Sequence, residues 1–287
     1  MAVERHVEAG SATTPPAPGS PWAAAPIHLQ ELLSLATDLA RDAGRVHVEG
    51  LRSALRLETK SSPTDLVSQV DREAERLIVE RLHDLRPDDA VLGEEGAAGQ
   101  GTSGVRWVID PLDGTTNYVY GYPAYAVSIA VETDGQPQIG VVFDSSAGRM
   151  YRALSGFGAF CDDQPIHVRE QPDLATALVA TGFSYEAAQR ERQGAVVAQV
   201  LGRLRDIRRG GTAALDLCHV AAGHVDAYWE LDLSPWDYAA GAVIAREAGA
   251  DVALPEAAHG HGPAVVAAHH ALLPAFLGLL RETGALA

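Results

Sequence analysis

The sequence contains few cysteines, few basic residues and no long apolar run. Cys161 and Cys218 are the only cysteines among its 287 residues, too few for a disulfide framework or a cysteine-based zinc site and suited to a reducing cytoplasm. No apolar run approaches the roughly 18 residues that a membrane-spanning helix needs. The polar segment 1–10 lacks the apolar core of a secretory signal peptide. These absences predict a soluble, cytoplasmic protein without a membrane partner.

Basic residues are outnumbered by acidic ones. The chain has 22 Lys and Arg residues against 38 Asp and Glu residues, for a formal net charge of −16. A field of this sign repels nucleic acid and anionic membranes, so we expect no direct nucleic-acid binding. Charge alone favours the simpler interpretation that the acidic residues maintain solubility. The 11 histidines include no set with the ligand spacing of a zinc site.

The composition changes along the chain after residue 26. Residues 1–26 hold five prolines among small residues and have no periodicity, which predicts a disordered tail. The length allows one large domain or two modest ones. Helical and strand patterns then follow one another without an internal repeat, in two halves that meet near residue 168. We therefore expect an N-terminal α+β half over 27–168 and a C-terminal α/β half over 169–287.

Apolar periodicity predicts the individual elements. The pair Asp134-Gly135 lies between two apolar runs, which is a strong signal for a β-hairpin. The expected helices cover 27–48, a segment around 70–82, 191–204, 212–222, 235–248 and 272–282. The expected strands cover 90–93, 105–109, 125–131, 139–143, 150–154, 177–181, 225–230 and 264–268. This mixture predicts a layered α+β fold.

A group of acidic and polar residues follows the expected strand 105–109 directly. Residues 110–117 read Asp-Pro-Leu-Asp-Gly-Thr-Thr-Asn. The carboxylates of Asp110 and Asp113 and the carbonyl of Leu112 can converge, and such oxygens are the ligands that Mg²⁺ prefers. The glycine of this segment lets the backbone pass close to a ligand. The alternative is a loop in which the aspartates cap their own backbone amides.

Further acidic residues lie at the ends of other expected elements. Glu94 and Glu95 follow a strand, whereas Asp71 and Asp237 lie near helix starts. Taken singly, Asp237 is more simply a helix cap, and Asp71 is an acid favoured by the helix dipole. Carboxylates that gather without cations repel one another and take up protons. If these stretches converge in space, bound cations are therefore expected.

Together these motifs resemble those of the inositol monophosphatase family, within the Mg²⁺-dependent, lithium-sensitive phosphatases. Their order and spacing agree with the family from about residue 27 to residue 270. The matching segments are 60–67 with Asp71 close behind, 93–95, 107–118, 211–214 and 236–241. The resemblance implies a layered α-β-α-β-α sandwich of the inositol monophosphatase and fructose bisphosphatase type, and a homodimer.

The resemblance also implies a role for each matching residue. The first metal ion would be held by Glu94, Asp110 and the Leu112 carbonyl, the second by Asp110, Asp113 and Asp237, and a looser third ion by Glu94. The catalytic group would be Asp71, Glu94 and Thr115, with Asp71 and Thr115 orienting the attacking water. The substrate-binding residues would be Asp113, Gly114, Thr115, Gly211, Ala213, Glu230 and Asp237. Without the resemblance, Glu230 is simply a charged residue at a strand end.

The activity implied by the resemblance is Mg²⁺-dependent hydrolysis of inositol monophosphate, by direct attack of a metal-activated water. Two or three bound cations would also offset the repulsion between an acidic protein and a phosphate substrate. Three alternatives keep this chemistry and change the substrate to histidinol phosphate, fructose 1,6-bisphosphate or a 3′-phosphoadenosine nucleotide. An alternative of another class is a non-enzymatic, transcription-accessory role.

Overall fold

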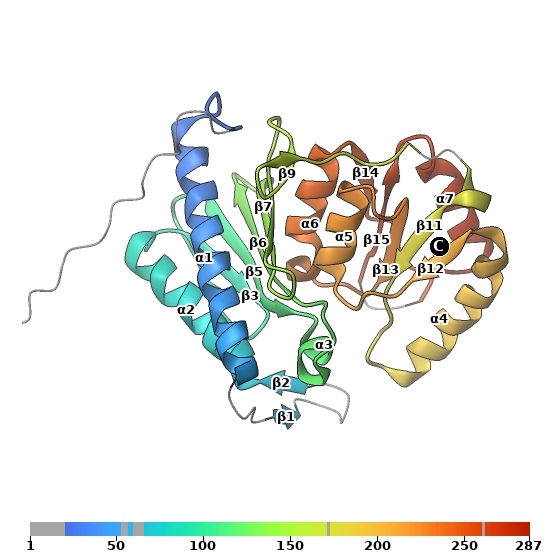
Figure 1. Cartoon of the computed structure of the whole chain (residues 1–287), viewed down its shortest axis with the longest axis horizontal. Coiled ribbons are helices and arrows are strands. Elements are labelled where there is room, and N and C mark those ends of the chain that lie inside the picture. The colour runs from blue at the N-terminus through green and yellow to red at the C-terminus, as the bar shows by residue number, and fades with distance from the viewer. Residues whose placement is uncertain (1–20, 53–56, 60–65, 171–172, 260–261) are drawn as a thin grey trace, which may run out of the picture.

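Helices and sheets alternate in layers across the molecule (Figure 1). The computed structural model describes residues 21–52, 57–59, 66–170, 173–259 and 262–287. Its helical layers are α1 (Ile27–Arg52) with α2 (Gln69–Leu85), α5 (Ala213–Ala221) with α6 (Pro235–Glu247), and α4 (Ala187–Val200) with α7 (Leu273–Glu282). One sheet lies between the first and second helical layers, and another between the second and third. The predicted α-β-α-β-α sandwich is confirmed.

The first sheet carries two of the acidic motifs at one edge. Within the described residues its strand order is β10-β9-β8-β7-β6-β5-β3-β4. The strands are β3 (Ala90–Gly93), β4 (Ala98–Gly99), β5 (Val105–Asp113), β6 (Ala126–Thr133), β7 (Gln136–Asp144), β8 (Arg149–Leu154), β9 (Ala159–Cys161) and β10 (Gln164–Pro165). Strands β3 and β5 are parallel, and Gly93 pairs with Ile109. Glu94 and Asp110 therefore follow paired residues at the same edge of the sheet.

The hairpin predicted at Asp134-Gly135 is confirmed between β6 and β7. Thr133 pairs with Gln136, so only two residues form the loop. Their φ angles are +50° at Asp134 and +75° at Gly135. Two successive positive φ angles are typical of a type I′ turn, whose twist matches that of the flanking strands. The local sequence therefore determines this turn.

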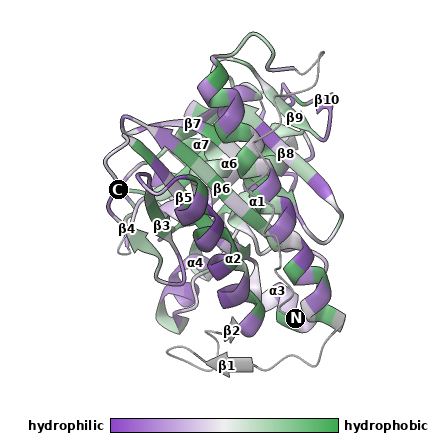
Figure 2. Ribbon diagram, turned by 90° about the vertical axis from the view of Figure 1, so that its left-hand side faces the viewer, coloured by the Kyte–Doolittle hydropathy of each residue, from purple (hydrophilic) through white to green (hydrophobic). Residues whose placement is uncertain are grey.

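Helix α1 packs its apolar stripe on the first sheet. Leu32, Leu35, Leu39 and Ala43 recur at helical spacing and are buried in the cluster that also holds residues of β5, β6 and β7. Figure 2 shows this contrast, with mostly green strands behind helices that carry purple on their outer side. The apolar periodicity stops near Val48, so the end of the helix was predicted there, but the helix continues to Arg52.

The second sheet brings another pair of chain segments together. Its strand order among the described residues is β12-β11-β13-β15-β14. The strands are β11 (Leu178–Thr181), β12 (Asp206–Arg208), β13 (Ala227–Leu231), β14 (Ala250–Ala253) and β15 (Ala264–His269). Strands β11 and β13 are parallel, and Thr181 pairs with Trp229, so Gly182 and Glu230 lie next to each other. Strands β12 and β14 were not predicted, because short edge strands have too few residues to show alternation.

Several other boundaries differ from the predictions. Strand β5 continues through the acidic motif to Asp113, with an irregular register between Asp110 and Asp113. The short helix α3 (Thr115–Tyr120) was not predicted. The helix expected over 191–204 begins at Ala187 and ends at Val200 before a 3-10 turn. Its first turn was not predicted, because that turn has no apolar periodicity. Strands β1 (Leu57–Thr59) and β2 (Leu66–Ser68) pair with each other, whereas residues 60–65 of the motif segment 60–67 lie outside the described residues.

The end of the expected disordered tail packs on the body of the protein. Trp22 and Ala25 are buried, which corrects the prediction that residues 21–26 belong to the tail. The Trp22 ring meets Phe160 edge-on at 5.0 Å between centroids, and the Arg152 guanidinium lies 5.0 Å from its centroid. Composition did not reveal this anchor, because a single aromatic residue has no periodicity. Residues 1–20 lie outside the described part of the chain.

Within the described ranges, no helix combines the length and the apolar character that a bilayer crossing requires.

Candidate active site

A pocket of about 590 Å³ collects residues from both halves of the chain. Its walls come from the ends of β3, β5 and β13, the starts of α3, α5 and α6, and the loop that joins β11 to α4. The residues that the sequence analysis selected and that line this pocket are Glu94, Asp110, Leu112, Asp113, Gly114, Thr115, Gly211, Ala213, Glu230 and Asp237. Asp71 is not part of the lining, but it contacts Thr115.

The segment after Asp110 is held by its own hydrogen bonds. The backbone N–H of Leu112 donates to Asp110 Oδ1 at 3.0 Å, which is the local capping expected for such a loop. The Thr115 hydroxyl lies 3.0 Å from both Asp71 Oδ2 and the Leu112 carbonyl oxygen. Its single hydrogen can be donated to only one of them at a time. Thr115 therefore connects α2 with the end of β5.

Asp113 joins the two halves of the chain. Its Oδ2 accepts a hydrogen bond of 2.8 Å from the backbone N–H of Ala214, in the first turn of α5. Asn117 makes a second connection, because its amide nitrogen donates to the Ala124 and Gly210 carbonyls at 2.7 and 2.9 Å. These bonds place the start of α5 directly beside the acidic motif.

Asp237 is both a helix cap and part of the pocket. Its Oδ2 accepts a hydrogen bond of 2.6 Å from the backbone N–H of Ser234, which forms a capping box at the start of α6. The Ser128 hydroxyl donates to the carbonyl of Trp236 at 3.3 Å, which attaches this turn to β6. The simple interpretation of Asp237 as a cap is therefore correct, and the cap also directs an acidic residue into the pocket.

Glu94 lies in a turn that a buried acid organises. The Glu75 carboxylate accepts hydrogen bonds from the backbone N–H groups of Glu95 and Ala97, at 2.9 and 3.2 Å. Asp71, Glu94 and Glu95 each offer a carboxylate oxygen within 4.8 Å of the others, a group that could hold a cation. Glu95 was not predicted as a ligand. The structure therefore adds a further carboxylate at this corner of the site.

Burial and mutual repulsion disfavour negative charge on the acids of the pocket. Burial raises the pKa of Asp110 well above its usual value, and the charges of Glu94, Asp113 and Asp237 raise it further. The pKa of Asp113 rises for the same reasons, burial first and Asp237 next. Burial also raises the pKa of Asp237 to about 8. A bound cation would reverse these shifts, because it stabilises the ionised carboxylates.

The donor atoms around the pocket fit Mg²⁺. The expected ligands Glu94, Asp110, Asp113 and Asp237 offer carboxylate oxygens, and Leu112 offers a carbonyl oxygen. Hard divalent cations prefer such oxygens, whereas zinc sites use nitrogen and sulfur as well. Buried carboxylates that repel one another need positive charge between them to stay ionised. The site therefore has the chemistry of a cation-binding centre.

Two glycines allow the backbone to approach the pocket closely. Gly114 has a φ angle of +90°, and a Cβ atom there would lie 2.8 Å from both the Ala124 carbonyl oxygen and a Thr212 methyl carbon. Gly211 has a φ angle of +91°, and a Cβ atom there would lie 2.3 Å from an Arg209 nitrogen. Any other residue would strain these turns and displace their neighbours.

Glu230 lines the same pocket from the end of β13. The Tyr228 hydroxyl donates to Glu230 Oε2 at 2.8 Å. Burial raises the pKa of Glu230 to about 7. The carboxyl group fills the space beside Gly182, where a Cβ atom would lie 2.0 Å from Glu230 Oε1. Glu230 is therefore more than an exposed strand-end charge.

Two positioning residues escaped the sequence analysis. Glu75 lies one helical turn after Asp71 on the buried face of α2, and an acid on such a face was the available signal. His47 lies on the buried face of α1, with Nε2 2.9 Å from the Pro111 carbonyl and Nδ1 2.9 Å from the Ser145 hydroxyl. Burial lowers the pKa of His47 to about 4. A neutral histidine therefore supports the loop that carries Asp110.

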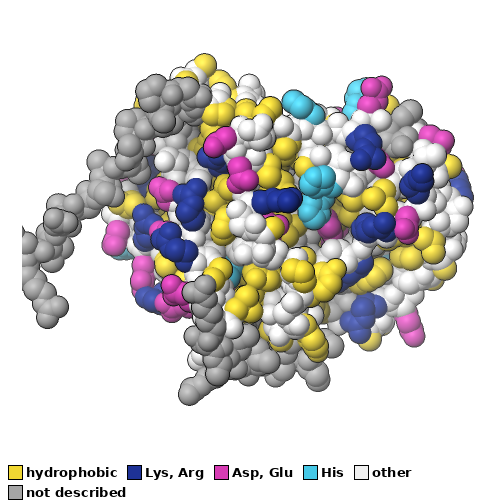
Figure 3. Space-filling view, viewed as in Figure 1, with side chains coloured by type: hydrophobic (Ala, Val, Ile, Leu, Met, Phe, Trp, Pro, Cys, Tyr) yellow, Lys and Arg dark blue, Asp and Glu magenta, His cyan; other side chains and the backbone are white. Residues whose placement is uncertain are grey.

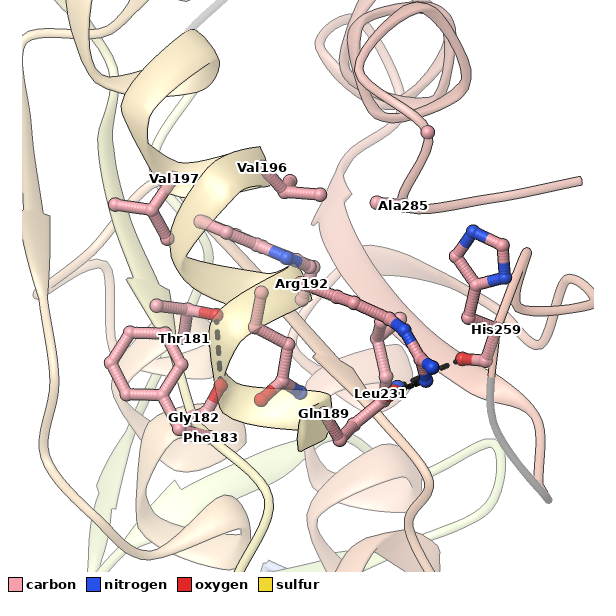
Figure 4. A pocket seen from close by; sticks show the side chains of 13 residues that line it. Thr181, Gly182, Phe183, Gln189, Arg192, Val196, Val197, Leu231, His259 and Ala285 are labelled. Carbon is pink, nitrogen blue, oxygen red and sulfur yellow. Dashed lines mark hydrogen bonds between the residues drawn. The ribbon is translucent and has the colours of Figure 1, made fainter. Parts of the chain in front are cut away.

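A second, smaller cavity lies between α4, the second sheet and the C-terminal segment (Figure 4). Its volume of about 20 Å³ is close to the space of a single water molecule. Phe183 and Leu231 border both cavities. The smaller cavity cannot hold a phosphorylated alcohol.

The layered fold and the oxygen-lined pocket together define a protein with a candidate cation-binding active site. The model of the inositol monophosphatase family matches residues 28–283. The chain belongs to this family, as its motifs predicted.

Individual relatives agree with the family match. The inositol-1-monophosphatase of Mycobacterium leprae is 48% identical over 242 residues, which cover 80% of this chain and 83% of that protein. The Nus factor SuhB of Vibrio cholerae is 40% identical over 227 residues, covering 78% and 85%. The solved structure of Mycobacterium tuberculosis SuhB has a TM-score of 0.77 at 41% identity, covering 89% of this chain and 98% of that one.

Proposed function

We propose that this chain is a Mg²⁺-dependent phosphomonoesterase whose substrate is inositol monophosphate. The observation that carries the proposal is the convergence of Glu94, Asp110, Asp113 and Asp237 on one pocket, in a member of the inositol monophosphatase family. The relative from Mycobacterium leprae bears the name inositol-1-monophosphatase, which favours this substrate over the other phosphomonoesters.

The metal ligands follow from the donor atoms. Glu94, Asp110 and the Leu112 carbonyl would hold one Mg²⁺, Asp110, Asp113 and Asp237 a second, and Glu94 a third. When bound, Mg²⁺ would stabilise charge on the phosphate oxygens and lower the pKa of a water molecule. The chain itself must then position that water and the substrate.

Thr115 and Asp71 are suited to orient the attacking water. When the Thr115 hydroxyl donates its hydrogen to Asp71 Oδ2, its oxygen keeps lone pairs that can accept a hydrogen bond from a water in the pocket. Asp71 Oδ2 can then receive a proton through this hydroxyl as the water attacks phosphorus. Glu94 contributes to the same corner of the site, because it lies within 4.8 Å of Asp71.

The remaining residues would bind the two ends of the substrate. The backbone N–H groups of Gly114 and Thr115 would donate to the phosphate, next to Asp113. Gly211, Ala213 and Glu230 would contact the alcohol, beside Asp237. The Glu230 carboxyl already accepts a hydrogen bond from Tyr228, and its other oxygen can accept one from an alcohol hydroxyl.

Phosphate release from inositol 1-phosphate tests the proposal. We expect release with Mg²⁺ and none after chelation, and slower release from histidinol phosphate, fructose 1,6-bisphosphate and 3′-phosphoadenosine nucleotides. The Asp113→Asn variant should lose most activity and stay folded, because an amide oxygen can still accept from the Ala214 N–H. Unchanged turnover in this variant at saturating Mg²⁺ would contradict the assignment.

A transcription-accessory role is the second candidate, because one relative is named Nus factor SuhB. On the face shown in Figure 3, the coloured Lys and Arg side chains are scattered among Asp and Glu side chains and do not form one patch. This pattern and the net charge of −16 favour catalysis over direct RNA contact. If the Asp113→Asn variant rescues a strain in which the gene is deleted, the accessory role gains support.

Family membership also suggests two properties that the same preparation can test. We propose that lithium inhibits the phosphatase and that the chain forms a homodimer. Inhibition is measured as phosphate release in increasing LiCl, with NaCl as the control for ionic strength. Light scattering after size-exclusion chromatography distinguishes a dimer from a monomer of 30.3 kDa.

A further inference from the structure

Arg209 is the one Lys or Arg side chain among the described residues that line the large pocket. The acids in the same lining are Glu94, Asp110, Asp113, Glu186, Glu230, Asp232 and Asp237. Within the described part of the chain, no salt bridge or hydrogen bond joins Arg209 to any of them. Its neighbour Arg208, in contrast, donates to Asp206 Oδ2 at 2.7 Å. The donor groups of Arg209 therefore remain available to a molecule in the pocket.

The Arg209 guanidinium is held in place by packing. Its central carbon lies 5.8 Å from the centroid of the Phe183 ring, in a cation–π contact with the loop between β11 and α4. Gly211 leaves room for the guanidinium, since a Cβ atom at that position would lie 2.3 Å from one of its nitrogens. Phe183 and Gly211 both line the pocket. The guanidinium is therefore part of the pocket wall on the alcohol side.

The charge of Arg209 lowers the pKa of groups on three parts of the chain. Burial raises the pKa of Glu230 on β13, and the Arg209 charge acts in the opposite direction. Burial also raises the pKa of Asp216 on α5 and of Tyr185 on the loop before α4, and the Arg209 charge lowers both. These effects place a hydrogen-bond donor in the same region as the acceptor Glu230. The acids Glu230 and Asp216 offset the charge of Arg209, so this end of the pocket has no excess positive charge.

We infer that Arg209 is a specificity-determining residue that selects an uncharged, polyhydroxylated alcohol, by donating hydrogen bonds to its hydroxyl oxygens while Glu230 accepts from its hydroxyl hydrogens. A hydroxyl group is both donor and acceptor, so a polyol in a closed pocket needs partners of both kinds. The ionised acids of the lining can only accept. The inference rests on the proposed function, which it extends to the alcohol half of the substrate.

The test uses the Mg²⁺-loaded full chain. It distinguishes binding of the alcohol from binding of the phosphate. We compare wild type, Arg209→Gln and the matched control Arg208→Gln by the KM for inositol 1-phosphate and the inhibition constant of inorganic phosphate. Arg209→Gln should raise KM about tenfold or more, the loss expected for a hydrogen bond from a charged donor. Its inhibition constant for inorganic phosphate should stay within about twofold of wild type, since phosphate lacks the alcohol. Arg208→Gln should match wild type in both.

Several results would overturn the inference. An unchanged KM in Arg209→Gln shows that Arg209 does not contact the alcohol. A parallel rise in both constants shows an effect on the phosphate or on the general field. If wild type prefers fructose 1,6-bisphosphate and only Arg209→Gln loses that preference, Arg209 binds a second phosphate. If wild type releases no phosphate from inositol 1-phosphate, the proposed function fails, and the inference fails with it.

Discussion

Without bound cations, Asp237 should make the protein less stable as the pH rises from about 4 to about 8. In the unfolded chain its carboxyl loses a proton near its usual pKa of 3.8, whereas in the fold burial raises that pKa to about 8. Between these values unfolding releases a proton, so stability falls as pH rises. Replacing Asp237 with Asn removes the charge and keeps an acceptor for the Ser234 N–H.

The magnitude follows from the size of the pKa shift. At about 1.4 kcal/mol per pKa unit, a change from 3.8 to about 8 corresponds to an upper limit of about 6 kcal/mol. Asp237 is partly exposed, and solvent screening reduces the effect to about 2 kcal/mol. The Asp237→Asn variant should therefore be more stable than wild type by about 2 kcal/mol at pH 8 and nearly equal to it at pH 4.

Urea unfolding in EDTA at pH 4 and pH 8 measures this difference. The matched control is Asp251→Asn, an exposed acid on the edge strand β14, which should not differ from wild type at either pH. Adding Mg²⁺ should stabilise wild type and have a smaller effect on Asp237→Asn, because the variant lacks one expected ligand. A variant that is less stable than wild type at pH 8 in EDTA would refute the reasoning.

Three further predictions concern residues outside the pocket lining. Glu75→Gln loses part of its hold on the Glu94 turn, so Mg²⁺ affinity measured by calorimetry should fall about tenfold or more; an unchanged affinity would show that the turn needs no such support. Burial lowers the pKa of His47 from 6.5 to about 4, so wild type should lose about 3 kcal/mol of stability relative to His47→Gln as the pH falls from 6.5 to 4. Parallel profiles of unfolding free energy against pH would contradict this. Trp22→Ala should cost about 3 kcal/mol in urea unfolding and leave turnover at 25 °C within about twofold; a loss of activity in the folded variant would show that the anchor reaches the site.

The sequence alone determined the features that depend on neighbouring residues. The Asp134-Gly135 hairpin follows from two residues that tolerate positive φ angles. The stripe of Leu32, Leu35 and Leu39 determined α1, because helical spacing places these side chains on one face. The ordered motifs of the chain were also sufficient to predict its family and its layered fold. Short edge strands and the Trp22 anchor were missed, since their stability comes from partners distant in sequence.

Only the tertiary structure decided which groups meet. Parallel pairing of β3 with β5 brings Glu94 beside Asp110, and packing of α5 against the first sheet brings Ala214 to Asp113. Such contacts depend on strand register and on layer packing, which short-range patterns do not encode. The same packing places Arg209 in the pocket and Arg208 at Asp206, although the two arginines are adjacent in sequence. Residue types therefore predicted the chemistry of the site, whereas the fold determined its geometry.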